Sequence, residues 1–209
     1  MTITDADKAY HSIKERIVTV QLQPGAIIQE ARLMEELNLG RTPIREALRR
    51  LQAENLVEVA PRRGVFVADI SLTDLQKIFE VRVEIESLCA RLAAERMSGE
   101  MMAEMHCLIA QCQARPEPDK RWLLQQDRLL HQLLARGTGN EFLYREFEQF
   151  YNLSIRIWHL ALNRIHPEDI NIEAHGEILK AVEARDSVSA GERMREHIHH
   201  FHQTIKQYL

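Results

Sequence analysis

The amino-acid sequence predicts a mainly α-helical protein, in which three short helices and a β-hairpin precede a six-helix antiparallel bundle. Apolar side chains recur at helical spacing through most of the 209 residues. The period changes over residues 56–70, LVEVAPRRGVFVADI, where an alternating pattern and a turn predict two short strands. We therefore expect one domain over residues 1–69 and a second, all-helical domain over residues 70–209.

The composition is that of an ordinary globular protein, with 45% hydrophobic and 28% charged residues. The sequence holds no run of about 18 apolar residues, which a transmembrane helix needs, and residues 1–11 lack the layout of a signal peptide. Three cysteines without a C-x-x-C spacing suit free thiols in a reducing compartment. We therefore expect a cytoplasmic protein with no membrane partner.

Basic side chains are concentrated in one stretch of an otherwise acidic chain. The net charge of −4 argues against a protein that coats nucleic acid indiscriminately. Residues 41–63, however, contain six arginines and only three glutamates. A small basic patch on an acidic body suits a local contact with phosphate.

The first domain begins with the outline of a helix-turn-helix. Residues 5–20 and 29–37 carry apolar side chains at helical spacing. Residues 38–40 are too few for anything but a tight turn before a third helix within residues 37–51, which we expect Thr42 to cap. Two short helices joined by such a turn form a helix-turn-helix.

Three arginines are spaced four residues apart along the third helix: Arg41, Arg45 and Arg49. Because the apolar side chains of the same stretch fall on the other face, the arginines face outward. A solvated basic face would explain this spacing equally well. The flanks favour nucleic acid, because a hairpin with the basic tip Pro61–Gly64 follows at once. That is the winged form of the motif, whose second helix enters the major groove.

Residues 24–67 resemble the DNA-binding domain of the GntR family of bacterial transcription regulators, through the segments RTPIREAL and RRGVFV. Members of that family often have Gly-Val-Ser where this chain has Asn38-Leu39-Gly40, which removes one possible phosphate contact. The resemblance implies double-stranded operator DNA as the partner. Together with the basic tip, it implies these DNA contacts: Arg41, Thr42, Arg45, Arg49, Arg62, Arg63 and Gly64.

The second domain is helical in pattern throughout. The expected helices cover residues 71–97, 101–113, 121–136, 140–162, 168–185 and 187–208. The apolar side chains expected to face inward from the first of them are Ile78, Ile85, Leu88, Cys89 and Leu92. Antiparallel helices of this length pack as a bundle, a fold that commonly encloses a ligand site.

Four polar side chains interrupt the apolar stripes of the bundle: Asp127, His131, His175 and His197. Asp127 and His131 are four residues apart and are therefore neighbours on one helix face. A buried histidine is more often a hydrogen-bonded core residue than a ligand, but each group left unpaired would cost about 1–3 kcal/mol. One carboxylate and three imidazoles could instead satisfy one another by binding a divalent cation.

Residues 78–205 are similar to the ligand-sensing domain of the FadR-type branch of the GntR family. In that branch an Asp-x-x-x-His pair and two later histidines hold a metal. The resemblance therefore implies these ligands: Asp127, His131, His175 and His197. His200 and His202 compete with His197 for the last position. Nitrogen-rich ligation suits Zn(II), Ni(II), Fe(II) or Mn(II), and zinc is our first choice.

Arg82 also lies in an apolar stripe, between Ile78 and Ile85, where an unpaired guanidinium would be costly. One interpretation is a bidentate clamp for the carboxylate of a small organic acid that acts as effector. The other is an ion pair with Glu86 on the same helix. We favour the clamp, because the resemblance implies an arginine on this helix that faces the effector.

These patterns predict a homodimeric transcription regulator, which we take to be a repressor, that binds a palindromic operator and is controlled by a small organic acid at the metal site. In one alternative the metal is purely structural or is itself the signal. In another the chain is a metal-dependent hydrolase. Against a hydrolase, the sequence shows no obvious general base and no Ser or Cys nucleophile motif. We therefore expect no enzyme activity.

Overall fold

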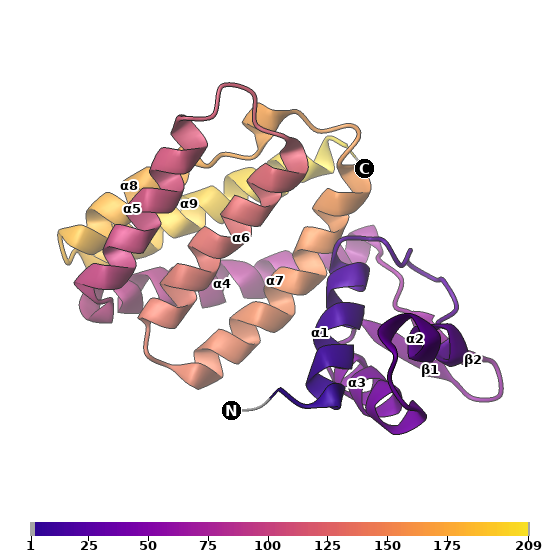
Figure 1. The fold of residues 1–209 in the computed structure, drawn as a ribbon. Coiled ribbons are helices and arrows are strands. Elements are labelled where there is room, and N and C mark those ends of the chain that lie inside the picture. Colours follow the sequence, from indigo (N-terminus) through magenta and orange to yellow (C-terminus); the bar gives the residue numbers. More distant parts are fainter. Residues whose placement is uncertain (1–2, 209) are drawn as a thin grey trace. The chain divides into compact units, whose positions relative to one another are not determined.

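The computed structural model describes residues 3–208, apart from the side chain of Leu72. Helices make up most of the structure, which confirms the predicted fold class (Figure 1). The chain divides into two compact units, one of residues 3–71 with 155–160 and one of residues 72–154 with 161–208. Within the described part of the chain, no helix is both long enough and apolar enough to cross a membrane.

Among its described residues, the first unit contains three helices and a two-stranded sheet: α1 (Asp5–Val18), α2 (Glu30–Leu37), α3 (Arg41–Ala53), β1 (Val57–Ala60) and β2 (Gly64–Val67). A capping box starts α1, because Thr4 and Asp7 each bond the other's backbone N–H through the side chain. α1 packs on α3, where Ile13, Ile17 and Ile44 are fully buried. Burial of each such side chain stabilises the unit by about 1.5–3 kcal/mol.

The turn between α2 and α3 has the expected helix-turn-helix outline. Asn38 ends α2 in the left-handed region (φ 51°), which asparagine tolerates better than most residues. The prediction that Thr42 caps α3 is wrong. The cap is Gly40, which makes no side-chain hydrogen bond, and the helix starts at Arg41. Thr42 and Pro43 lie in the first turn, where backbone N–H groups have no partner within the helix, so proline is tolerated there.

β1 and β2 form the predicted hairpin, paired antiparallel with Ala60 opposite Gly64 at the turn. The backbone N–H of Arg63 donates to the carbonyl oxygen of Ala60 (3.0 Å) and closes that turn. Arg62 (φ 64°) and Gly64 (φ 115°) have positive φ. The second value is one that side-chain-bearing residues rarely adopt, so the turn requires glycine at position 64 for conformational reasons.

The second unit consists of the six expected helices and a short 3-10 turn within the described range: α4 (Leu72–Arg96), α5 (Gly99–Gln113), α6 (Lys120–Gly137), α7 (Glu141–Ala161, whose residues 155–160 cluster with the first unit), η1 (Pro167–Asp169), α8 (Glu173–Glu183) and α9 (Ser187–Lys206). Side-chain oxygens of Ser98, Asp119 and Asp186 cap α5, α6 and α9. α4 contacts α6, α8 and α9, and α8 contacts α9. The interior of this unit is therefore shared by helices far apart in the sequence.

The single helix expected over residues 168–185 is wrong, because the chain breaks before α8. Pro167 starts a separate 3-10 turn, which Asp169 closes by accepting from the backbone N–H of His166 (2.6 Å). Ile170 then leaves the helical region (φ −89°, ψ 84°). Asn171 restarts the helix, since its Oδ1 accepts from the N–H of Ala174 (3.2 Å).

Only part of the expected inward face of α4 is buried. Cys89 is buried as expected. The other four side chains of that prediction stay partly exposed: Ile78, Ile85, Leu88 and Leu92. The buried face of α4 instead includes Arg82 and Glu86, whose side chains are 3% and 2% exposed. Charged groups therefore occupy buried positions that the apolar pattern assigned to hydrophobic side chains.

Candidate functional site

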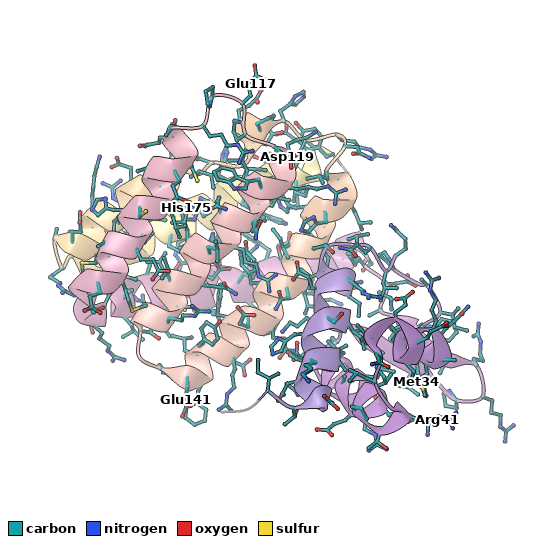
Figure 2. All side chains as sticks on the ribbon, in the orientation of Figure 1. Met34, Arg41, Glu117, Asp119, Glu141 and His175 are labelled. Carbon is teal, nitrogen blue, oxygen red and sulfur yellow. The ribbon has the colours of Figure 1, made fainter. Side chains whose placement is uncertain are left out.

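Four polar side chains meet inside the second unit. Asp127 and His131 project from α6, His175 from α8 and His197 from α9, and none is more than 4% exposed. Figure 2 labels His175 among the helices of this unit. One ligand-capable atom of each residue lies within 4.8 Å of those of the others. The structure thus brings together the four residues that the sequence selected for a metal site.

The converging atoms are Oδ1 of Asp127 and Nε2 of the three histidines. Oδ1 lies 3.6 Å from Nε2 of His131, 3.6 Å from that of His175 and 3.8 Å from that of His197. These separations are too long for hydrogen bonds, whereas the Nε2 atoms of His131 and His197 approach to 3.2 Å. Ligand atoms bonded at about 2.1 Å to one metal ion lie about 3–4 Å apart, so the arrangement has the spacing of a ligand shell.

Hydrogen bonding among the described residues leaves buried nitrogen atoms of this cluster without partners. Both ring nitrogens of His175 and Nδ1 of His197 lack a hydrogen bond. Each such group costs about 1–3 kcal/mol when it is buried and unsatisfied. Three imidazoles and one carboxylate form a donor set that divalent transition metals accept, so the residues present fit a metal ion.

Neighbouring side chains orient two of the four residues. The hydroxyl of Tyr151 on α7 donates to Oδ2 of Asp127 (2.8 Å), which leaves Oδ1 facing the imidazoles. Oε2 of Glu86 on α4 contacts Nδ1 of His131, which favours a ring proton on Nδ1 and leaves Nε2 as the nitrogen that could bind a metal. The sequence suggested Glu86 only as a partner for Arg82, and no pattern in it singles out Tyr151.

The charges in the cluster compensate one another. Burial opposes ionisation of Asp127, but the three histidines, His131 first, outweigh it and lower the pKa of Asp127. Burial also opposes a charge on His131, but Glu86 and Asp127 raise its pKa to about 9. Burial and then the charge of His131 lower the pKa of His175 to about 4. Burial and the neighbouring imidazoles likewise lower that of His197 well below its ordinary value. The site therefore favours one positive charge, which a metal can supply in place of a proton.

The structure separates His197 from its two competitors. His200 is exposed. His202 is buried, but its ring stacks on Phe79 with centroids 3.9 Å apart, and it is not part of the converging group. His197 is therefore the histidine of α9 that faces the cluster.

Arg82 is buried beside the cluster and is tied to Glu86. Its Nε donates to Oε1 of Glu86 (2.5 Å) and its Nη1 donates to Oγ of Ser154 (2.7 Å). The guanidinium carbon lies 5.0 Å from the ring centroid of Tyr151 and 5.1 Å from that of Phe201. Nη2 has no hydrogen-bond partner among residues 3–208. The ion pair considered as the alternative is thus present, yet the guanidinium keeps donors for a further acceptor.

The side chains of α3 divide between an exposed face and a face that binds α1. The exposed ones include Arg41, which Figure 2 labels, and three more of the expected DNA contacts: Thr42, Arg45 and Arg49. Arg50 faces the other way, since its Nη1 donates to Oδ1 of Asp7 (2.8 Å) and its guanidinium lies 3.9 Å from the ring centroid of Tyr10. Arg50, one of the six arginines of the basic stretch, therefore stabilises the fold of the first unit.

One of the candidates for DNA contact has a local ion-pair partner. Arg45 pairs through Nε with Oε2 of Glu30 on α2 (2.9 Å), although its side chain is still 57% exposed. Arg62, Arg63 and Gly64 are all exposed at the tip of the hairpin. The first unit thus presents basic groups both on α3 and at the hairpin tip, separated along the chain by β1.

Residues 5–67 match the family described as bacterial regulatory proteins, gntR family, and residues 77–200 match the FCD domain. The HTH-type transcriptional repressor GlaR of Escherichia coli (strain K12) is 31% identical over 208 residues, which is 95% of this chain and 94% of that protein. The HTH-type transcriptional regulator McbR of the same strain is 27% identical over 84% of this chain and 81% of its own length. The solved structure of E. coli McbR/YncC has the same fold, with a TM-score of 0.88 at 24% identity over 99% of both chains.

Proposed function

The chain belongs to the GntR family of bacterial regulatory proteins, and from this premise we propose that it is a metal-dependent repressor controlled by a small carboxylate. The family and these relatives are DNA-binding transcription regulators and not enzymes. Repression is supported by the relative GlaR, which is named a repressor. Such a protein would act on operator DNA in the cytoplasm.

The convergence of Asp127, His131, His175 and His197 on one buried point carries the proposal. Four protein ligands leave open positions on a metal that accepts about five or six. When bound, the metal would supply a Lewis-acid site for a carboxylate oxygen. Arg82 is linked to this cluster through Glu86, which contacts His131, and its unpartnered Nη2 could donate to the same anion. Zinc remains our first choice, with Ni(II), Fe(II) and Mn(II) as competitors.

Zinc added to the metal-stripped chain is expected to raise its thermal midpoint, because a ligand that binds only the folded state stabilises it by about 2.7 kcal/mol at a hundred times its Kd. His175→Gln should abolish this shift, since it removes a converging nitrogen. His200→Gln, at an exposed histidine of α9, should retain it. Differential scanning calorimetry with Zn(II) measures both. A full shift in His175→Gln would contradict the proposed ligand set.

For DNA we propose that α3 lies in the major groove and that the hairpin tip reaches the backbone or the minor groove. The exposure of Arg41, Thr42, Arg45 and Arg49 on one side of α3 supports this placement. Arg62, Arg63 and Gly64 would supply the contacts of the tip. The ion pair with Glu30 leaves the Nη groups of Arg45 free to read a base edge, since only its Nε is engaged.

Arg49→Ala is expected to weaken binding about equally for all DNA sequences and to lower the salt slope of binding by about one, the behaviour of a phosphate contact. Arg45→Ala should instead cost about 1–3 kcal/mol on the cognate site and relax the preference at one base pair. Fluorescence anisotropy on a duplex selected by the full chain from a random library measures both. Arg91→Ala, which removes an exposed arginine of α4, is the control for net charge.

A carboxylate effector is expected to lower the operator affinity of the zinc-loaded chain by about 5–150-fold, the usual range of allosteric coupling. The panel should contain simple monocarboxylates, hydroxy acids and dicarboxylates. Arg82→Lys keeps the charge but loses the planar fork, so it should demand a higher effector concentration. If no acid has an effect but chelation does, the metal is itself the signal. If neither has an effect, the metal is structural.

We also propose a homodimer that pairs through α4. The partly exposed apolar side chains of this helix are spaced alternately three and four residues apart, as in helices that pack against a second helix: Ile78, Val81, Ile85, Leu88 and Leu92. A two-fold axis there would present two copies of α3 to a palindromic operator.

Leu88→Glu is expected to convert the dimer to a monomer, because it places a charge in the middle of this row. Val188→Glu changes an exposed valine at the start of α9 and serves as the matched control. Sedimentation velocity of both variants measures the effect. A Leu88→Glu chain that still sediments as a dimer would move the interface elsewhere.

A further inference from the structure

Glu86 is a buried carboxylate that lies outside the four-residue cluster, and the sequence suggested it only as a partner for Arg82. Its side chain is 2% exposed, and each of its two oxygens has a different partner. Oε1 accepts from Nε of Arg82 (2.5 Å), one turn earlier on α4. Oε2 contacts Nδ1 of His131 on α6. Glu86 therefore joins the arginine of the proposed effector site to a residue of the proposed metal site.

The chemistry of an imidazole ligand gives this contact a consequence. A histidine that binds a metal through Nε2 must carry its proton on Nδ1, and a carboxylate acceptor at Nδ1 fixes both that tautomer and the orientation of the ring. In the cluster it is Nε2 of His131 that faces Asp127 and His197. The Glu86 contact thus holds His131 in the form that can donate its Nε2 lone pair.

Arg82 in turn holds Glu86. An isolated carboxylate would be unstable at this depth, and a neighbouring guanidinium compensates its charge. Glu86 is in contact with the guanidinium of Arg82 and with the ring of His131, and all three side chains are almost fully buried. Ser154 and the rings of Tyr151 and Phe201 restrain the guanidinium from other sides. Arg82, Glu86 and His131 therefore form a chain of polar contacts, with Glu86 in the middle.

We propose that Glu86 is a positioning residue, which sets the tautomer and orientation of His131 for metal binding while anchoring Arg82. This inference rests on the metal site of the proposed function. It goes further by assigning a role to a residue that would touch neither metal nor effector.

Glu86→Gln is the informative variant, because an amide has one acceptor oxygen where the carboxylate has two. If that oxygen accepts from Arg82, the amide N–H₂ faces Nδ1 of His131 and drives the ring proton to Nε2, where it blocks the metal. If it accepts from His131, the N–H₂ faces the guanidinium donors. Glu84→Gln is a matched control, since Glu84 lies on the same helix and pairs with Arg195 of α9 (2.7 Å) at the surface.

The test measures Co(II) affinity of the full-length chain by its d–d absorption, with competition by Zn(II). We expect Glu86→Gln to weaken binding by about 10–100-fold, as loss of an outer-shell partner of a ligand does, and to change the Co(II) spectrum. Glu84→Gln should match the wild type in both. Wild-type affinity and an unchanged spectrum in Glu86→Gln would overturn the inference and leave the metal site standing. A wild-type chain that binds no Co(II) would overturn the proposed function itself.

A second measurement needs no variant and so does not depend on whether Glu86→Gln folds. Two-bond ¹H–¹⁵N correlation spectra of the Zn(II)-loaded wild-type chain report which nitrogen of each histidine is protonated. We expect a proton on Nδ1 of His131, shifted downfield by its contact with a carboxylate. A metal on Nδ1, or a proton on Nε2, would overturn the role assigned to Glu86.

Discussion

Compensation of the charge on the buried Asp127 carboxylate is the interaction on which the second unit most depends. A carboxylate at 1% exposure loses its hydration, which costs several kcal/mol unless other groups replace it. Tyr151 donates to one oxygen, and His131, His175 and His197 surround the other. These partners come from α6, α7, α8 and α9, so four helices must meet at this point for the charge to be tolerated.

The break before α8 has a direct effect on that meeting point. Because the helix restarts at Glu173, His175 lies in its first turn. An unbroken helix over residues 168–185 would have to run straight through Ile170, whose backbone is not helical, and would carry a different direction into the bundle. Asn171 and Pro167 therefore act on the site without touching it, since they decide where α8 begins.

Periodicity predicted most of the fold, because apolar spacing reports which side of a helix is buried. It gave the helix-turn-helix, the hairpin and six later helices, with ends within a few residues except at the start of α8, where it missed the break in the chain. It failed at Thr42, which lies two residues after the observed cap Gly40, and on α4, whose buried face includes Arg82 and Glu86. The spacing of polar residues within the apolar stripes of single helices also identified the four residues of the cluster. They could not supply Tyr151 or the contact of Glu86 with His131, because those contacts depend on which helices become neighbours.

The charges of the proposed site argue for the class of its effector. A divalent cation and Arg82 would together bring three positive charges into a space that Glu86 and Asp127 fill with two negative ones. The remaining positive charge is buried, and an uncompensated buried charge is costly. A single carboxylate bound at the metal would cancel it. A second carboxylate on the same molecule would restore an imbalance unless it reached solvent. On this count of charges, we propose that a monocarboxylate suits the site better than a dicarboxylate.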